Sequence, residues 1–356
     1  MDKFLKLREK MKDQGLDAIV VFDELNARYL AEYAFTDGYL CISQNEAFLI
    51  TDFRYYEAAL ECANSNFQVL NPKSRDEFFA SFISRNNVKK FGFEGGSVTY
   101  AVYKKYQDTY PEVEFVSIGR IIEDLRRIKS AEEIGYMQAA QDITDKAFSH
   151  IINVLTPNMT EIDVAAELEY IMRKLGAEGP AFDTIAVSGK ASSVPHGVPR
   201  NVKLESGFLT MDYGAKVNGY LSDMTRTVVI GKADADMKKL YNTVLTAQKK
   251  ALEFLRAGVD AGEADKVARD IIDACPEYKG TFGHSLGHSI GLRVHEQPGL
   301  STRSFGIKLQ AGQITSVEPG IYLFGKYGCR IEDMVAITED GILNFTKSPK
   351  DLIEIY

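Results

Sequence analysis

The stretch that most constrains the fold is residues 209–229, LTMDYGAKVNGYLSDMTRTVV, in which apolar and small polar residues alternate. This alternation is typical of a β-strand with one buried face. Near its centre, Asn218 and Gly219 form the dipeptide that favours a tight primed turn between two antiparallel strands. We therefore expect a β-hairpin with these two residues as its loop.

The expected hairpin presents two carboxylates. In this register Asp212 faces Thr225 and Asp223 faces Gly214, so both aspartates lie on one face of the ribbon. Carboxylates about 5–8 Å apart repel each other unless a cation lies between them. The alternative is a pair of solvated aspartates on an exposed face, and the hairpin alone does not decide between the two.

Length and composition exclude several classes of protein. A chain of 356 residues is long for one core, so two domains are expected. The 42 Lys+Arg against 50 Asp+Glu give a net charge of -8, which argues against nucleic acid and membrane surfaces as partners. The four cysteines have no CxxC spacing, and we see no signal peptide or apolar run of about 20 residues. These features predict a cytoplasmic protein.

From residue 2 to about residue 119, strand and helix patterns alternate. This predicts an α/β layer domain with a largely parallel sheet. No Gly-rich phosphate-binding loop follows any of the strands, so we expect a structural role for this half. Strands are expected at 18–22, 39–43, 46–51, 67–70, 90–93 and 114–118, and helices at 4–14, 53–62, 76–85 and 100–109.

The remaining chain is predicted to form two similar halves. Ser130 and Glu133 form a capping-box pattern that starts a long helix ending near residue 155, and Thr160 caps a second helix that ends near residue 176. A strand near 184–187 and the first hairpin follow. The order then repeats, with helices at about 235–256 and 263–274 and a second hairpin at 314–338. An α+β domain of this kind would leave a cleft between its halves.

The second hairpin also carries two carboxylates. If its turn centres on Gly325, Glu318 and Glu332 are directly opposed and face the same way. Histidines gather in glycine-rich contexts between and beside the two hairpins, where a ligand can approach the backbone closely. These histidines are His196, His284, His288 and His295.

One imidazole and four carboxylates make an oxygen-rich set of candidate ligands without a thiolate. The set consists of Asp212, Asp223, His288, Glu318 and Glu332. It suits a pair of harder divalent ions such as manganese, cobalt or iron better than a structural zinc. Two such ions about 3.5–4 Å apart can lower the pKa of a water held between them. The sequence therefore predicts a hydrolase site.

Two alternatives compete with this interpretation. His284-x-x-x-His288 resembles the i, i+4 pair of a mononuclear zinc site, but Gly283, Gly287 and Gly291 make a helix there unfavourable. In a site without ligand, the two acidic pairs would be buried without cations, which is energetically costly.

These residues resemble the pita-bread metallopeptidases of the aminopeptidase P and prolidase group, over nearly the whole length. The resemblance rests on PHG at 195–197, MDYGAKVNGYLSDMTRT at 211–227, GHSLGHSIGLRVHE at 283–296, VEPGIY at 317–322 and RIED at 330–333. LRRIKSAEEI at 125–134 is similar to the family's junction between domains. The resemblance implies an α/β N-terminal domain over 1–124 and a pita-bread catalytic domain with pseudo-two-fold halves over 125–356.

The resemblance also assigns roles within the candidate ligand set. Asp223 and Glu332 would bridge two divalent ions, with manganese the first expectation and cobalt, iron or zinc the alternatives. Asp212 would bind one ion, and His288 and Glu318 would bind the other. His196 and His295 match the family's catalytic histidines that do not bind metal, and Glu318 would also move a proton during catalysis. A homodimer is a further expectation from the family.

The resemblance implies small proline-containing peptides as substrates. Prolidases of this group often carry an arginine soon after the His-Glu pair, where it can bind a dipeptide's carboxylate. Here HEQPGL places Gly299 at that position, and Arg303 lies close in sequence. We therefore expect an Xaa-Pro aminopeptidase, with an Xaa-Pro dipeptidase as the alternative. A peptide-binding scaffold without activity is a remote alternative, because such scaffolds lose metal ligands, whereas all five candidate ligands are present here.

Overall fold

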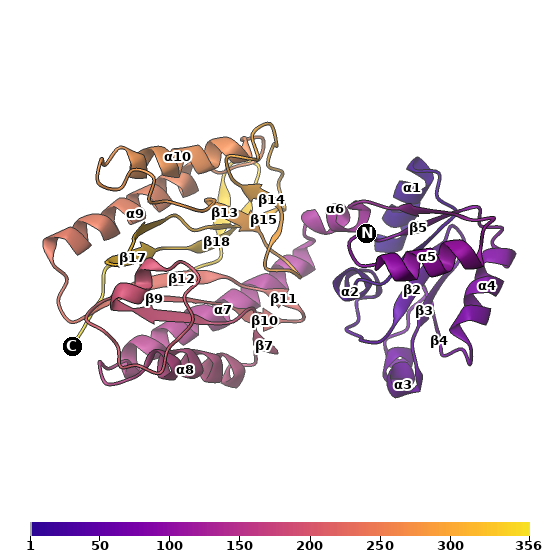
Figure 1. Cartoon of the computed structure of the whole chain (residues 1–356), viewed down its shortest axis with the longest axis horizontal. Coiled ribbons are helices and arrows are strands. Elements are labelled where there is room, and N and C mark those ends of the chain that lie inside the picture. The colour runs from indigo at the N-terminus through magenta and orange to yellow at the C-terminus, as the bar shows by residue number, and fades with distance from the viewer. Residues whose placement is uncertain (1) are drawn as a thin grey trace. The chain divides into compact units, whose positions relative to one another are not determined.

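The structure is a computed structural model that describes residues 2–356. It divides into two compact units, Met1–Arg126 and Arg127–Tyr356 (Figure 1). The boundary between residues 124 and 125 stays a prediction. Among residues 2–356, no helix is long and apolar enough to cross a membrane.

The first unit is built on one six-stranded sheet with strand order β4-β3-β2-β1-β5-β6. Its strands are β1 Ala18–Val21, β2 Tyr39–Ser43, β3 Ala47–Ile50, β4 Gln68–Leu70, β5 Lys90–Phe93 and β6 Glu114–Ser117. Its helices are α1 Lys3–Asp13, α2 Glu24–Ala31, α3 Phe53–Glu61, α4 Arg75–Arg85 and α5 Tyr100–Thr109, and α6 Ile121–Arg127 ends at the unit boundary. All expected strands and helices are present, whereas α2 and α6 were not predicted.

The sheet of the first unit is mixed rather than largely parallel. β1 pairs with β5, β3 with β4 and β5 with β6 in parallel, but β2 pairs antiparallel with both β1 and β3. The link between β2 and β3 is too short for a crossover, which a parallel pair requires. Aromatic side chains of α4, including Phe79 and Phe82, pack on Phe91 of β5 in the core.

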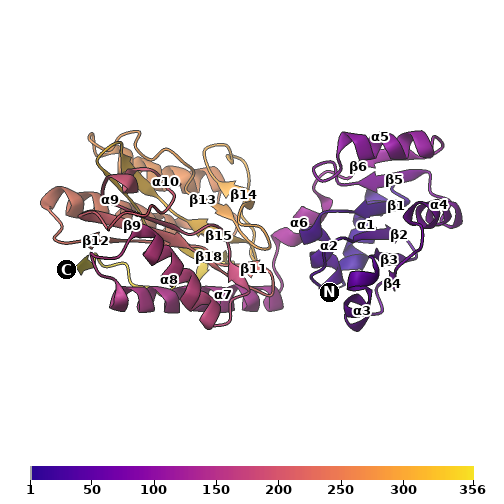
Figure 2. The same ribbon diagram turned by 60° about the horizontal axis from the view of Figure 1, so that its bottom comes forward.

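The second unit contains the two similar halves that the sequence predicts. Its helices are α7 Ala131–Val154, α8 Glu161–Lys174, α9 Ala235–Phe254 and α10 Ala261–Asp273, with a short 3-10 helix η1 at Gly189–Ser193. Its strands are β7 Gly179–Pro180, β8 Ile185–Ser188, β9 Gly207–Tyr213, β10 Ala215–Val217, β11 Tyr220–Leu221, β12 Met224–Ile230, β13 Gly287–Ser289, β14 Glu296–Leu300, β15 Ile314–Val317, β16 Gly320–Leu323, β17 Tyr327–Arg330, β18 Asp333–Ile337, β19 Ile342–Asn344 and β20 Glu354–Ile355. Figures 1 and 2 show α7 and α8 on one side of these strands and α9 and α10 on the other.

The two long helices of the first half begin where the sequence predicts. Ser130 and Glu133 form a reciprocal capping box at α7, and Thr160 and Asp163 form another at α8. The apolar faces of both helices pack on one side of the sheet β20-β12-β9-β8, in a core that includes Leu209. Phe208, the residue before Leu209 in β9, packs in the core of the second half. The sheet is therefore buried on both faces, and alternate residues of β9, including Asp212, face the second half.

The first hairpin has the predicted register. β9 and β12 pair Asp212 with Thr225, and Asn218 and Gly219 form the turn with φ values of 47° and 77°. The ladder is interrupted between β9 and β10 at Gly214, where a Cβ would lie 1.9 Å from the carbonyl oxygen of Ser222. This close approach explains why glycine occupies the position.

The second hairpin is centred on Gly325, as predicted, with a φ of 71°. β15 pairs with β18 and β16 with β17, both in the register that this turn sets. Glu318 and Glu332 lie in the gap between the two paired segments, and Asp223 lies in the matching gap of the first hairpin. Three of the predicted ligands thus lie where the ladders are interrupted.

Candidate metal centre

All five predicted ligands line one cavity of about 780 Å³ in the second unit. They come from both halves, because Asp212 and Asp223 belong to the first hairpin while the others follow α10. The cavity wall also includes His196, His284, His295, Arg330 and a segment over residues 182–185.

Three of the five form a compact group with the geometry of a metal site. One ligand atom each from Asp223, His288 and Glu332 lie within 4.8 Å of one another. The Nε2 atom of His288 is 3.6 Å from Oδ2 of Asp223 and 3.4 Å from Oε1 of Glu318. These distances place four of the predicted ligands around one point.

Burial and mutual proximity make it unfavourable for all carboxylates of this cluster to be ionised at the same time. Burial and then the charges of Asp212 and Glu318 raise the pKa of Asp223 well above its ordinary value. Burial and then the charge of Asp223 do the same to the pKa of Glu332. Burial is also the main cause that raises the pKa of Glu318 to about 8, partly offset by Arg330. Divalent cations between these groups would remove the repulsion.

His288 is prepared to act as a neutral ligand. Its Nδ1 atom lies 3.2 Å from the carbonyl oxygen of Ser289, which can only accept a hydrogen bond, so Nδ1 carries the proton. This leaves the lone pair of Nε2 facing the carboxylates. Burial, followed by the neighbouring His295, lowers the pKa of His288 to about 4.

Asp212 provides the test of whether the residues fit a metal. Its Oδ2 atom accepts a hydrogen bond from Arg330 at 2.5 Å, but its Oδ1 atom is buried without a hydrogen-bond partner among residues 2–356. Buried polar atoms in folded proteins rarely remain unsatisfied. A cation against Oδ1 would satisfy it, so the donor set fits divalent metal ions.

Hydroxyl groups orient two of the remaining ligands. The hydroxyl of Thr225 donates to Oε2 of Glu332 at 2.7 Å. The hydroxyl of Ser316 donates to Oε1 of Glu318 at 3.1 Å and accepts from the backbone N–H of His288 at the same distance. Such supporting bonds fix the direction in which a ligand presents its lone pairs.

The two predicted catalytic histidines lie beside the ligand cluster. The ring of His295 is 4.3 Å from the ring of His288, centroid to centroid. Burial and then the neighbouring His196 lower the pKa of His295. His196 is exposed on the cavity wall, in a loop that Arg200 ties to the fully buried carboxylate of Glu161.

A hydrogen-bonded chain that the sequence did not predict runs from His284 to Asp212. His284 donates from Nδ1 to the carbonyl oxygen of Ser285, and its Nε2 accepts from the hydroxyl of Tyr322 at 2.9 Å. Arg330 donates to that hydroxyl at 2.7 Å and also to Asp212. Burial and then Arg330 lower the pKa of His284 to about 4, which keeps the ring neutral. The sequence feature that could have indicated this chain is Arg330, which lies two residues before the candidate ligand Glu332.

The fold and this cavity define a metallopeptidase. Residues 135–339 match metallopeptidase family M24, and residues 3–128 match the creatinase/prolidase N-terminal domain. The chain therefore belongs to metallopeptidase family M24, as the resemblance predicted. The two-part architecture with a pita-bread catalytic unit is likewise confirmed.

Three relatives illustrate the similarity. The Xaa-Pro dipeptidase of Pyrococcus furiosus is 37% identical over 99% of both chains. The solved structure of an Xaa-Pro dipeptidase from Bacillus anthracis has a TM-score of 0.95 at 39% identity and covers 100% of this chain and 99% of its own. The structure of an X-Pro aminopeptidase from Thermotoga maritima has a TM-score of 0.91 at 34% identity, with 100% of both chains covered.

Proposed function

We propose that this chain is an Xaa-Pro dipeptidase that uses two divalent metal ions, with manganese the first candidate. The observation that carries the proposal is the convergence of all five ligand-type side chains on one cavity. Similarity to Xaa-Pro dipeptidases over the full length supports the substrate class. The aminopeptidase activity expected from the sequence is less well supported than dipeptidase activity.

In the proposed site, Asp223 and Glu332 would hold both ions, Asp212 would complete the ligands of the first ion, and His288 and Glu318 would hold the second. Burial and the charges of neighbouring carboxylates raise the pKa values of both Asp223 and Glu332 well above their ordinary values, which suits a position between two cations. When bound, two such ions supply a water of lowered pKa and polarise the carbonyl group that is attacked.

The chain's own residues supply the other parts of the reaction. A bond before proline has a nitrogen without hydrogen, and the ring holds φ near about -65°. The breaking C–N bond therefore needs a proton delivered to that nitrogen. Glu318 would accept a proton from the attacking water and deliver it to the leaving nitrogen. His196 and His295 would orient the peptide and stabilise charge on its carbonyl oxygen.

One observation favours Xaa-Pro aminopeptidase as a second candidate. A dipeptidase must recognise the free carboxylate after proline, yet Gly299 offers no side chain for this. Arg330 is the one lysine or arginine on the cavity wall formed by residues 2–356, and its guanidinium already donates to Asp212, Tyr322, Thr225 and the carbonyl of Pro195. Arg303 is exposed and does not line the cavity.

The test compares kcat/KM for an Xaa-Pro dipeptide and the matching Xaa-Pro-Yaa tripeptide, with the purified protein loaded with Mn²⁺. The proposal expects a higher value for the dipeptide. A higher value for the tripeptide would replace it with the aminopeptidase, and cleavage of neither would reject both.

A Gly299→Arg variant sharpens the comparison. Gly299 pairs with His288 across β13 and β14, so its Cβ would face the same side as that ligand, and the nearest atom to it is 3.5 Å away. If a cation is missing at this position, the variant raises the ratio of dipeptide to tripeptide cleavage. An unchanged ratio would show that other residues bind the carboxylate.

A further inference from the structure

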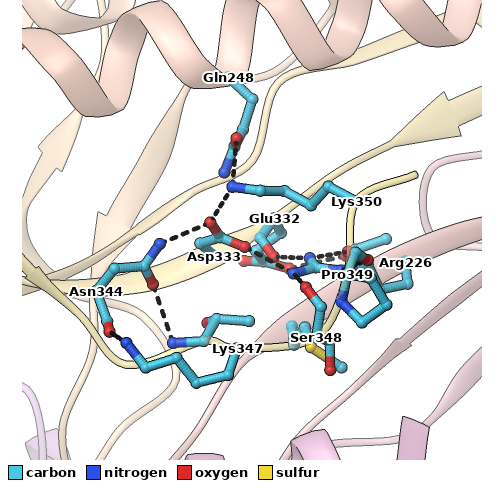
Figure 3. Close-up of polar contacts among 12 residues, drawn as sticks. Arg226, Gln248, Glu332, Asp333, Asn344, Lys347, Ser348, Pro349 and Lys350 are labelled. Carbon is cyan, nitrogen blue, oxygen red and sulfur yellow. Dashed lines mark hydrogen bonds and ion pairs between the residues drawn. The ribbon is translucent and has the colours of Figure 1, made fainter. Parts of the chain in front are cut away.

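A buried network of charged side chains lies directly behind the proposed bridging ligand Glu332. Its centre is Asp333, whose Oδ1 accepts from Arg226 at 2.9 Å and whose Oδ2 accepts from Lys350 at 2.5 Å and Asn344 at 2.9 Å. Figure 3 shows Lys350 extending between Asp333 and Gln248, whose Oε1 it also contacts at 3.0 Å. Arg226 and Asp333 are almost completely buried.

All five N–H groups of Arg226 are used. Two of them reach the C-terminal segment, at the carbonyl oxygens of Ser348 and Pro349, and a third reaches Asp333. The remaining two, on Nη1, donate to the carbonyl oxygens of Thr225 at 3.0 Å and Glu332 at 2.5 Å. One guanidinium thus joins the first hairpin, the second hairpin and the C-terminal segment.

Both polar groups of the Glu332 backbone, its N–H and its carbonyl, form hydrogen bonds. Its N–H donates to the carbonyl of Thr225 at 3.1 Å, and its carbonyl accepts from Arg226. The hydroxyl of Thr225 meanwhile donates to its carboxylate. Since Arg226 bonds to both Thr225 and Glu332, its position sets the spacing between these residues.

We propose that Arg226, Asp333 and Lys350 are positioning residues for the metal centre, and that the segment 348–350 supports the metal ligand Glu332 through them. The chemical reason is that a buried arginine with all donors used has one position, and Asp333 keeps it there only while its own charge is balanced. Lys350 supplies that balance from the C-terminal segment. This inference rests on the proposed metal centre.

The experiment measures the dissociation constant for Mn²⁺ by calorimetry, on metal-free protein at fixed pH. In Lys350→Met the ammonium is lost, while the side-chain stem is kept at a position where the side chain is about one-fifth exposed. We expect Mn²⁺ binding to weaken by about 10-fold or more, the range found when groups supporting a metal ligand are removed. Lys350→Arg, which keeps a cation beside Asp333, should recover most of the affinity.

Lys347→Met is the matched control. Lys347 immediately precedes this segment, is exposed and donates to the carbonyl of Asn344 rather than to Asp333. We expect its Mn²⁺ affinity to equal that of the wild type. Denaturant unfolding of the metal-free variants is measured in parallel, because a purely structural role would lower their unfolding free energy and leave the Mn²⁺ affinity unchanged.

The outcomes separate the two proposals. If the wild-type protein binds no Mn²⁺, the metal centre itself is wrong. If it binds Mn²⁺ and Lys350→Met binds equally well, the positioning role is wrong. Should Lys350→Met fail to fold, Lys350→Gln keeps a donor to Asp333 and is expected to bind Mn²⁺ with intermediate affinity. Wild-type affinity in that variant would also overturn the inference.

Discussion

Arg330 and Asp212 form a buried ion pair in which one carboxylate oxygen is bonded and the other is not. Nη2 of Arg330 donates to Oδ2 at 2.5 Å, while Oδ1 has no partner among residues 2–356. The arginine thereby fixes the rotation of the carboxylate and leaves Oδ1 available to a cation. An acidic residue held in this way is oriented for a cation rather than for another side chain.

The first prediction concerns metal removal. A chelator should abolish peptidase activity, and added Mn²⁺ or Co²⁺ should restore it. Asp223→Ala and Glu332→Ala should each lose bound metal and cleavage, because each removes a proposed bridging charge. Metal content by elemental analysis and activity on an Xaa-Pro peptide are the measurements.

Asp183→Ala serves as the control for this prediction. Asp183 is an exposed acidic residue on the same cavity wall that lies outside the proposed ligand set. Its removal should leave the metal content unchanged. Full activity of the chelated, metal-free protein would refute the metal centre.

The second prediction separates catalytic histidines from ligands. His196→Ala and His295→Ala should keep their metal but lower kcat by about 10²–10³-fold, the range for losing one donor to a developing oxyanion. His150→Ala is the control, because His150 pairs with Glu167 between α7 and α8. Loss of an ion from either of the first two variants would reassign that histidine to the ligand set.

The sequence predicted those parts of the structure that depend on local signals. The registers of both hairpins follow from short turns at Asn218-Gly219 and at Gly325, whose positive φ values are compatible with these residues. The long helices begin at Ser130 and Thr160 because both capping boxes are encoded within four residues. The candidate ligands followed from these registers and from the family resemblance.

The parts that the sequence did not predict depend on residues far apart in the chain. Arg226 and Asp333 are separated by 107 positions, and Arg330 and Asp212 by 118. No local pattern indicates which buried arginine meets which carboxylate, since this depends on the packing of the two halves. The antiparallel pairing of β2 was missed for a related reason, because strand direction is set by connections rather than by the strand's own residues.

The third prediction tests the interruption of the first hairpin. In Gly214→Ala the new Cβ would lie 1.9 Å from the carbonyl oxygen of Ser222, a backbone atom that cannot rotate away. We expect a loss of about 1–3 kcal/mol or more in the free energy of unfolding, together with weaker metal binding, because Asp223 follows Ser222 directly. Denaturant unfolding and Mn²⁺ titration measure the two effects.

Gly341→Ala is the matched control for the glycine. A Cβ at Gly341 would meet no atom within 4 Å among residues 2–356, apart from its own chain neighbours, so we expect a change within about 0.5 kcal/mol. Equal stability of the two variants would mean that the hairpin adjusts to a side chain at position 214.

The fourth prediction uses the buried carboxylate that anchors the His196 loop. Glu161 accepts hydrogen bonds from the backbone N–H and hydroxyl of Ser188 and from the backbone and guanidinium of Arg200. Burial raises its pKa, but these donors outweigh burial and hold the pKa of Glu161 below its ordinary value of 4.5. The folded state therefore binds fewer protons at this residue than the unfolded state near that pH.

It follows that Glu161 stabilises the fold above about pH 4.5 and loses this contribution as the pH falls through its lower, folded-state pKa. Glu161→Gln should lower the free energy of unfolding by about 1–3 kcal/mol at pH 7, and the difference from wild type should shrink as the pH approaches 3. Denaturant unfolding of metal-free protein between pH 3 and 7 measures it. Glu167→Gln, on the same helix and one-third exposed, should show a smaller difference. A difference for Glu161→Gln that stays constant down to pH 3 would show that its charge does not anchor the loop.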